Sequence, residues 1–150
     1  MHERHNVIIA GMGLAALTTA ACLTELGVKD IALYADGFGG TPYIDAINFV
    51  LPENPYGDTE EQYYEDMIHA GYEIGNRDLV RDMTRRAHDA YDLLCRWGVK
   101  FAHNEDGTIK LRHVSGHTYP RTLCQTTRLI GEVMVDALLP KLEKAGVKIH

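Results

Sequence analysis

Two apolar runs flank a helix-like segment at the start of the chain. Residues 6–10 (NVIIA) form a nearly continuous apolar run, which is typical of a strand buried on both faces of a parallel sheet. Residues 14–26 are rich in Ala and Leu and predict a helix, for which Gly27 provides a stop signal. Residues 30–35 (DIALYA) predict a second strand after a short connection. The pattern therefore predicts a β-α-β unit.

The chain changes character after this unit. Gly and Pro recur over residues 37–58, which indicates a loop. Helices are predicted over residues 59–75 and 76–97. Thr59 and Gln62 have the spacing of a capping box at the start of the first helix, Gly75 is a stop signal at its end, and Asn76 is an N-cap for the second. The sequence therefore predicts two helices in this part of the chain.

The last third of the chain mixes short apolar runs with loops. Residues 99–101 and 109–111 predict two short strands around the Asp106-Gly107 turn, whereas VSGHTYPR indicates a loop. Residues 126–144 predict a final helix, and VKIH begins a strand. Together with the opening unit, these elements predict an α/β fold.

Composition and charge exclude several function classes. A length of 150 residues suits one domain, and the formal net charge of −6 argues against a nucleic-acid partner. No apolar run reaches the roughly 18 residues of a membrane span. The three cysteines and eight histidines show no metal-ligand spacing, so we expect a cytoplasmic protein without a metal site or a disulfide framework.

The strongest chemical signal is the GxGxxA motif of residues 11–16, Gly-Met-Gly-Leu-Ala-Ala. It lies between the first strand and its helix, where Gly11 permits a tight turn, Gly13 lets a pyrophosphate approach the backbone, and Ala16 allows close packing. The helix N-terminus then presents free N–H groups to the phosphates. A dinucleotide is therefore predicted, although the motif does not separate NAD from FAD, and the alternative is a corner whose glycines serve packing alone.

Charged residues near this unit have two interpretations. Asp36 follows the second strand, where an acidic residue binds ribose hydroxyls in such units, but a solvated turn residue fits the pattern equally well. Arg81, Arg85 and Arg86 lie on a helix rich in acidic residues, and we interpret them as a solvated face.

Several further segments carry a family resemblance. They are NVIIAGMGLAALTTA, Gly39-Gly40-Thr41, the stretch from Asp66 to Val80 (DMIHAGYEIGNRDLV), LLCRWGVKF and SGHTYPRTL. In their order and spacing, nearly all 150 residues resemble the N-terminal part of the fumarate reductase, succinate dehydrogenase and L-aspartate oxidase flavoprotein family. The resemblance implies a Rossmann-like FAD-binding β-α-β unit with a helical segment over it, incomplete relative to the family. Residues 1–150 would then be the N-terminal part of an FAD-binding domain.

The resemblance also implies site residues. The pyrophosphate would lie at the glycine loop, the ribose near Asp36 and the flavin side near His117 and Arg121. The alternatives are that His117 is a loop histidine bonded to backbone and that Arg121 pairs with an acid. The full predicted cofactor-binding set is Gly11, Gly13, Leu14, Ala15, Ala16, Asp36, Gly40, Thr41, His117 and Arg121.

The implied function is that of a flavoprotein oxidoreductase, in which FAD passes a hydride through N5 to or from a dicarboxylate-like substrate. The loop GGTPY contains no histidine, so we expect the FAD to bind non-covalently. Residues 45–48 (DAIN) replace a Gly-Gly pair of the family, and the family's substrate-binding residues lie in later segments, so catalytic residues stay unassigned. The alternative is a non-catalytic or partner-dependent FAD-binding module that joins a second subunit or a homo-oligomer.

Overall fold

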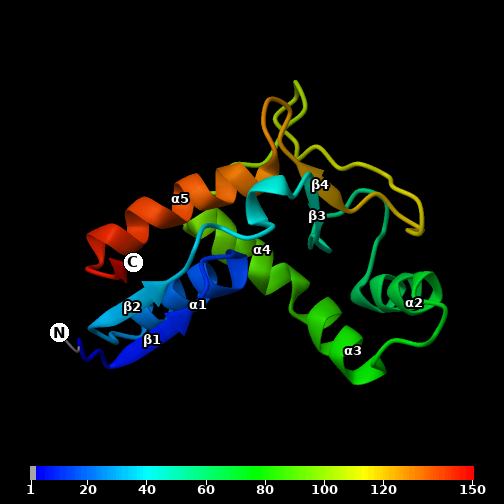
Figure 1. Cartoon of the computed structure of the whole chain (residues 1–150). Coiled ribbons are helices and arrows are strands. Elements are labelled where there is room, and N and C mark those ends of the chain that lie inside the picture. Colours follow the sequence, from blue (N-terminus) through cyan, green and yellow to red (C-terminus); the bar gives the residue numbers. More distant parts are fainter. Residues whose placement is uncertain (1–2) are drawn as a thin grey trace. The chain divides into compact units, whose positions relative to one another are not determined.

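The computed structural model describes residues 3–150, which divide into two compact units. Unit 1 comprises residues 3–45, 97–99 and 128–150, and unit 2 comprises residues 46–96 and 100–127. Each unit has its own sheet, and Figure 1 shows the strands and helices that belong to each.

Unit 1 contains a three-stranded parallel sheet in the order β1-β2-β5. Strand β1 (Val7–Ala10) pairs along its whole length with β2 (Ile31–Tyr34), and β2 pairs with β5 (Lys148–Ile149). Helix α1 (Leu14–Glu25) joins the first two strands. The predicted β-α-β unit and the predicted α/β class are therefore confirmed.

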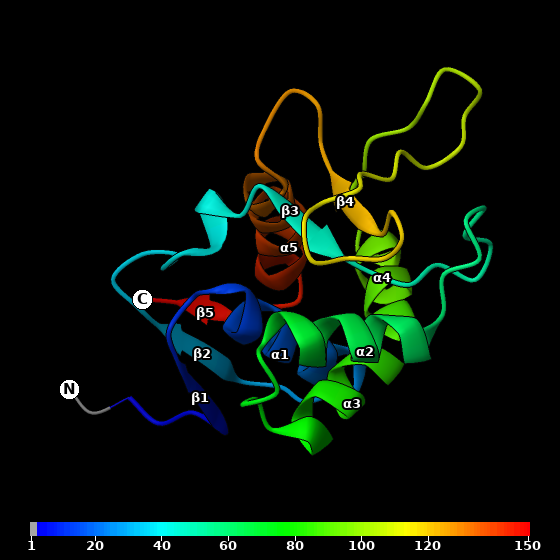
Figure 2. The same ribbon diagram turned by 90° about the vertical axis from the view of Figure 1, so that its right-hand side faces the viewer.

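Helices α1 and α5 (Ile130–Lys144) pack against each other on one face of this sheet. Figure 2 shows the three strands side by side in the order β1, β2, β5. Right-handed crossovers that advance in the same direction along a parallel sheet place their helices on the same face. The fully buried side chains between the helices and the sheet include Leu17, Ile31, Leu33, Leu138 and Leu142.

The short segment 97–99 belongs to unit 1 through Trp97. The buried Trp97 ring donates a hydrogen bond from its Nε1 to Glu25 at 2.6 Å, and Lys141 pairs with the same carboxylate at 3.1 Å. The indole N–H is thus satisfied, as a buried Trp requires. Glu25 of α1 therefore connects Trp97 with α5.

The opposite face of the sheet is covered only in part, because Ala32 of the central strand is buried whereas β1 is partly exposed, which corrects the prediction that residues 6–10 are buried on both faces. Burial alternates along β1, and Ile8 is 59% exposed. The register places Ile8 beside Ala32 and Ala10 beside Tyr34, so these four residues share the face turned away from α1 and α5. The apolar run suggested a strand covered on both faces, but within unit 1 helices lie on only one face of the sheet.

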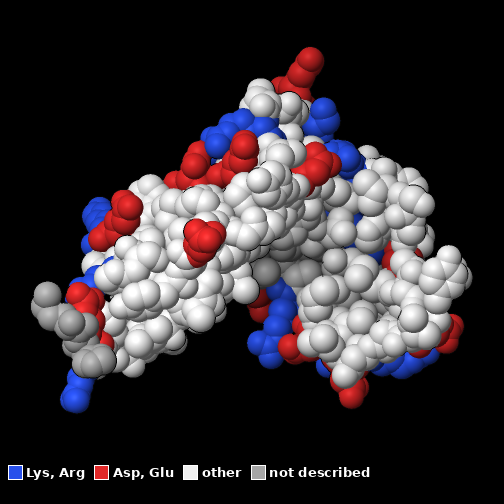
Figure 3. All heavy atoms as spheres, viewed as in Figure 1, with Lys and Arg blue, Asp and Glu red and all other residues white. Residues whose placement is uncertain are grey.

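Acidic and basic side chains lie next to each other on the surface of unit 1. Arg128 pairs with Glu132 at 3.3 Å and with Asp136 at 2.7 Å along α5, and Figure 3 shows red and blue side chains interspersed there. This face therefore carries no basic stripe of the kind that binds nucleic acid. Within residues 3–150, no helix has both the length and the apolar character needed to cross a bilayer.

Unit 2 contains a two-stranded antiparallel sheet that the sequence did not predict. Strand β3 (Ala46–Asn48) pairs with β4 (Thr122–Cys124), and both are too short for an alternating pattern to be read. Phe49, Tyr91 and Phe101 pack beside them, with ring centroids 5.5–6.1 Å apart. This aromatic group forms part of the unit's own core.

Three helices, rather than the predicted two, occupy residues 60–96: α2 (Glu60–Ala70), α3 (Arg77–Arg85) and α4 (Ala87–Arg96). The N-caps are confirmed, since Thr59 accepts from the Gln62 N–H and Asn76 accepts from two N–H groups of α3. The predicted stop at Gly75 is wrong, because α2 ends at Ala70 with Gly71 as its C-cap. The single helix over residues 76–97 is wrong. The buried Thr84 hydroxyl donates to the Arg81 carbonyl just before the break, a contact that bends helices.

The predicted hairpin over residues 99–111 is only partly present. Its turn is confirmed, because Gly107 has φ +85° and the Asp106 carboxylate accepts from the Thr108 N–H and hydroxyl. The two strands are wrong, since the segment forms one isolated bridge between His103 and Ile109. The N–H of Ala102 instead donates to the Cys124 carbonyl, which joins this segment to β4.

Candidate functional site

The glycine loop forms a tight turn at the carboxyl end of β1. Gly11 has φ +107°, a conformation that side chains disfavour, and its N–H donates to the Tyr34 carbonyl at 2.8 Å. Gly13 has ordinary angles, φ −72° and ψ 175°, and caps α1 without any side-chain hydrogen bond. The two glycines therefore have different physical roles: Gly11 makes the turn, and Gly13 leaves the helix end uncovered.

Helix α1 begins with N–H groups that have no acceptor within the helix. The Gly13 carbonyl accepts from the Leu17 N–H, so the N–H groups of Leu14, Ala15 and Ala16 lie ahead of the first helical bond. The Thr41 hydroxyl accepts from the Leu14 N–H at 2.7 Å. The N–H groups of Ala15 and Ala16 remain for an anion, whose charge the positive end of the helix dipole favours.

The second predicted loop is folded against this helix end. Thr41, which is buried, starts a short 3₁₀ helix, η1 (Thr41–Tyr43), for which Gly40 is the cap. A Cβ built on Gly13 would lie 3.5 Å from the Thr41 Oγ1, an ordinary contact distance. The structure therefore brings Thr41 and the glycine loop together, as the predicted site requires.

Gly131 holds this second loop in place, and the sequence did not identify it. Its N–H donates to the Ile44 carbonyl at 3.0 Å, and a Cβ at this position would lie 1.7 Å from the Thr41 carbonyl oxygen. Only a glycine allows the first turn of α5 to approach η1 so closely. A glycine inside the helix predicted over residues 126–144 was the available signal.

Asp36 lies at the same edge of the sheet as the glycine loop. It follows β2 by two residues, and the carboxyl ends of the parallel strands β1 and β2 lie together, as the bond from Gly11 to Tyr34 shows. Its side chain is exposed. This placement suits a carboxylate that accepts hydrogen bonds from ribose hydroxyls.

The residues predicted for the flavin side, His117 and Arg121, belong to unit 2. Arg121 is fully buried, and its guanidinium binds Asp58 through Nε at 2.9 Å and Nη2 at 2.6 Å. Nη2 also lies 2.9 Å from an Asp66 oxygen, and the guanidinium lies 4.6 Å from the centroid of the Tyr63 ring. Arg121 thus pairs with acids, which was the structural alternative for this residue.

The same network fixes the loop around His117. Asp66 accepts hydrogen bonds from the N–H of Thr118 at 2.8 Å and from its hydroxyl at 2.7 Å, and His117 Nδ1 lies 3.4 Å from Arg121 Nη1. Burial, followed by the charge of Arg121, lowers the pKa of His117, so its ring is neutral at pH 7. Two carboxylates against one guanidinium leave this group with a net negative charge, and its contact with a cofactor stays a prediction.

Residues 45–48, where the chain departs from the family's Gly-Gly pair, contribute to β3. The Asn48 side chain accepts a hydrogen bond from the Thr122 hydroxyl at 2.6 Å, across the pair of strands. A side chain at this position therefore stabilises the sheet of unit 2.

A pocket of about 840 Å³ in unit 2 contains none of the predicted site residues. It is lined by residues of the segments 51–56 and 104–111 and by His88, Tyr91 and Asp92 of α4. Sequence reasoning missed it because its walls come from three separate segments that show no shared motif.

Comparison with known proteins gives consistent matches over almost the whole chain. The model of a family described as "FAD binding domain" matches residues 6–150. The acrylate reductase flavoprotein subunit of Shewanella woodyi is 28% identical over 153 residues, and L-aspartate oxidase of Pyrococcus horikoshii is 32% identical over 117 residues. These alignments cover 97% and 77% of this chain but only 29% and 23% of the two relatives.

Solved structures show the same fold at lower identity. Escherichia coli quinol fumarate reductase matches with a TM-score of 0.84 and 18% identity, over 97% of this chain and 25% of that one. The Mycobacterium smegmatis Sdh1 complex matches with a TM-score of 0.80 and 20% identity, over 97% and 27%. The chain therefore spans less than a third of the length of these relatives, and the resemblance stated from the sequence is confirmed.

Proposed function

The chain belongs to the family of FAD-binding domains, and from that premise we propose that it forms the FAD-binding part of a flavoprotein oxidoreductase of the fumarate reductase and succinate dehydrogenase type. The predicted cofactor, FAD, is confirmed by this membership, and NAD is no longer favoured. Hydride transfer, the substrate and the partners are our proposals.

The observation that carries the proposal is the uncovered N-terminus of α1. Gly11 turns the chain, Gly13 has no side chain in front of the helix, and Thr41 satisfies the Leu14 N–H. The N–H groups of Ala15 and Ala16 would then bind the pyrophosphate, and Asp36 would bind the adenosine ribose. Gly40 and Thr41 would complete the cradle. FAD, when bound, supplies the hydride acceptor or donor at N5.

The proposed substrate is a small dicarboxylate. Relatives named for L-aspartate oxidation and a structural neighbour named for fumarate reduction support this class, whereas the relative named for acrylate reduction supports a monocarboxylate. The described residues bind and orient the cofactor, so substrate recognition is assigned to no residue of this chain.

The test uses the full-length protein with its bound flavin under anaerobic conditions. We expect aspartate or succinate to bleach the flavin absorption band, or fumarate to restore it after chemical reduction. Acrylate serves as the monocarboxylate comparison. If no dicarboxylate changes the band while acrylate does, the dicarboxylate proposal is wrong. Acid precipitation of the same sample tests non-covalent binding, because released FAD stays in the supernatant.

One observation favours the partner-dependent alternative. Strand β1 is at an edge of the sheet, and its residue Ile8 is 59% exposed, which leaves apolar surface for a partner to cover. In that case Ile8→Lys would abolish an association seen by light scattering in the unsubstituted protein. A protein that stays monomeric, with or without this substitution, would exclude the homo-oligomer and leave a second subunit as the form of the alternative.

A further inference from the structure

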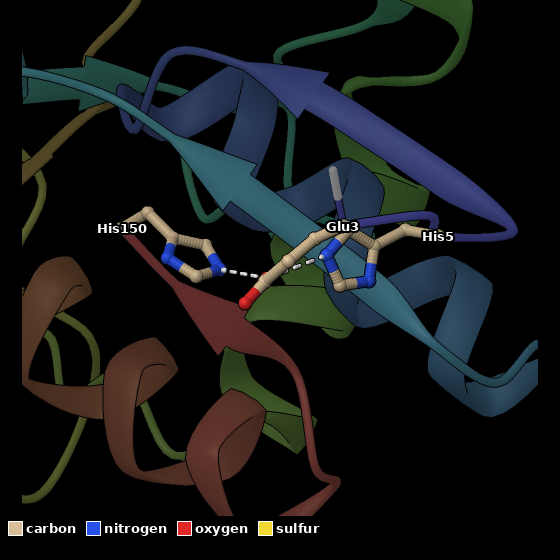
Figure 4. A group of neighbouring side chains, drawn as sticks. All are labelled: Glu3, His5 and His150. Atoms are coloured by element: carbon tan, nitrogen blue, oxygen red, sulfur yellow. Dashed lines mark hydrogen bonds and ion pairs between the residues drawn. The ribbon is translucent and has the colours of Figure 1, made fainter. Parts of the chain in front are cut away.

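A group of three side chains that could bind a metal ion lies in unit 1 and includes no residue of the glycine loop. Glu3, His5 and His150 place one ligand atom each within 4.8 Å of one another. Figure 4 shows the two imidazole rings and the carboxylate pointing toward a common centre. No sequence pattern indicated this group, because its members lie at positions 3, 5 and 150 and have no ligand spacing.

The distances suit one small cation. Glu3 Oε2 lies 3.4 Å from His5 Nε2 and 3.8 Å from His150 Nε2. Two ligand atoms that bind the same tetrahedral zinc ion at 2.0–2.1 Å are about 3.3 Å apart. Glu3 therefore lies at about the distance from each imidazole that a shared ion requires. Two His and one carboxylate leave a fourth position for water.

The His5 ring is held by a contact of its second nitrogen with Asp30. Its side chain is only 1% exposed, and its Nδ1 lies 2.8 Å from Asp30 Oδ1. In this geometry the Asp30 carboxylate accepts a hydrogen bond from Nδ1 and fixes the orientation of the ring. The Nε2 lone pair then faces Glu3. A carboxylate behind a histidine is the usual support for a metal-bound imidazole.

His150 is held by the sheet itself. Its N–H donates to the Leu33 carbonyl at 2.9 Å and its carbonyl accepts from Ala35 at 3.0 Å. Its ring stacks on Tyr34, with a centroid distance of 4.4 Å and an interplanar angle of 7°. Two of the three ligands are therefore fixed by contacts that do not involve Glu3.

We propose that Glu3, His5 and His150 form a binding site for a divalent transition-metal ion of the zinc type, with Asp30 orienting His5. Imidazole and carboxylate ligands together select zinc, nickel or copper over magnesium and calcium. The bound ion would connect the residues before β1 to the end of β5. The site is independent of the cofactor proposal, since it uses no residue of the FAD cradle.

The test is metal binding by the full chain after chelator treatment, with Co²⁺ as the spectroscopic probe and Zn²⁺ as the competitor. We expect one Co²⁺ per chain, with the intense visible bands of a four- or five-coordinate ion that Zn²⁺ removes. Glu3→Gln and His150→Gln should abolish these bands, whereas His69→Gln, which changes an exposed histidine of unit 2, should retain them. Circular dichroism confirms that each variant is folded.

Asp30→Asn tests the positioning role without straining the backbone. Asp30 has φ +58°, which Asn adopts readily. We expect about 10- to 100-fold weaker Zn²⁺ binding with the number of ions unchanged. The proposal is overturned if the chain binds neither ion, or if Glu3→Gln and His150→Gln bind Co²⁺ as His69→Gln does. In that case the three side chains form pairwise ionic contacts only.

Discussion

The two units of this chain are stabilised in contrasting ways. Unit 1 buries small and aliphatic side chains between a parallel sheet and two helices, and its candidate cofactor site consists mainly of backbone N–H groups at the start of α1. Unit 2 buries Arg121 with two aspartates beside short strands. Backbone sites tolerate sequence change wherever the chain path is kept, whereas a buried ion network depends on each partner. Substitutions should therefore separate the two units.

The largest expected loss of stability comes from substitution of Arg121. Arg121→Met leaves Asp58 and Asp66 buried without their cation, and we expect a loss of about 3–5 kcal/mol in the free energy of unfolding. Urea denaturation measures it. Arg128→Met removes exposed ion pairs of unit 1 and should change stability by no more than about 0.5 kcal/mol.

A second variant distinguishes charge from packing at the same place. The triple substitution Asp58→Asn, Asp66→Asn and Arg121→Met removes the unpaired charges, so we expect it to regain part of the stability that Arg121→Met alone loses. Equal stabilities for the single and triple variants would mean that the network contributes through side-chain packing alone.

The next largest expected loss of stability comes from the contact between η1 and α5 in unit 1. Gly131→Ala places a methyl group 1.7 Å from the Thr41 carbonyl oxygen, which forces the loop or the helix to move. We expect a loss of about 1–3 kcal/mol, measured as a lower midpoint of thermal unfolding. Gly40→Ala is the matched control for stability, since its φ of −81° and the open space around it accept a methyl group. Equal midpoints for the two variants would contradict this account of the packing.

The smallest effect is the pH dependence of unit 2. Burial raises the pKa of Asp66, but hydrogen bonds from Thr118 and Gln62 and the charge of Arg121 together lower it below 3.8. The unfolded chain then binds the proton more tightly, so this stabilisation is complete above pH 3.8 and is lost as the pH falls toward the folded pKa. Urea titrations across this range should show a weaker dependence for Asp66→Asn.

His117 adds a second window at higher pH. Its pKa is lowered from 6.5 by burial and by Arg121, so folding is less favourable once the unfolded chain protonates this ring. Stability should therefore decline as the pH falls through 6.5, and His117→Gln should remove that part of the decline. A stability that rises over the same interval would show that the sign is wrong.

Local patterns predicted more of unit 1 than of unit 2. The glycine loop, α1 and both flanking strands depend on residues within one β-α-β segment, so their spacing was visible in the sequence. The bond from the Leu14 N–H to Thr41 and the contact of Gly131 with η1 depend on residues far apart in the chain. The family resemblance identified Thr41 as a site residue, but no sequence pattern indicated its contacts with Leu14 and Gly131.

In unit 2, contacts between residues far apart in the chain made several predictions wrong. The pairing of Arg121 with Asp58 spans 63 positions, and neither residue lies in a periodic pattern. The apolar residues of 99–101 predicted a strand of a local hairpin. The Ala102 N–H instead donates to the carbonyl of Cys124, which lies far along the chain, and no local pattern indicates this contact. The helix break at Arg86 lies inside an apolar periodicity that continues on both sides, so the pattern predicted one helix.

The most direct test of the account is FAD titration of the full chain, followed by flavin fluorescence, for the unsubstituted protein and two alanine variants. Gly13→Ala keeps the fold, since its nearest contact would be 3.5 Å, but places a methyl group at the start of α1. We expect FAD to bind about 10- to 100-fold more weakly, equivalent to one lost hydrogen bond to a charged group. Gly75→Ala in unit 2, which meets only Val80 at 3.9 Å, should bind FAD normally. Equal affinities of the Gly13→Ala and Gly75→Ala variants would contradict a pyrophosphate site at this helix end.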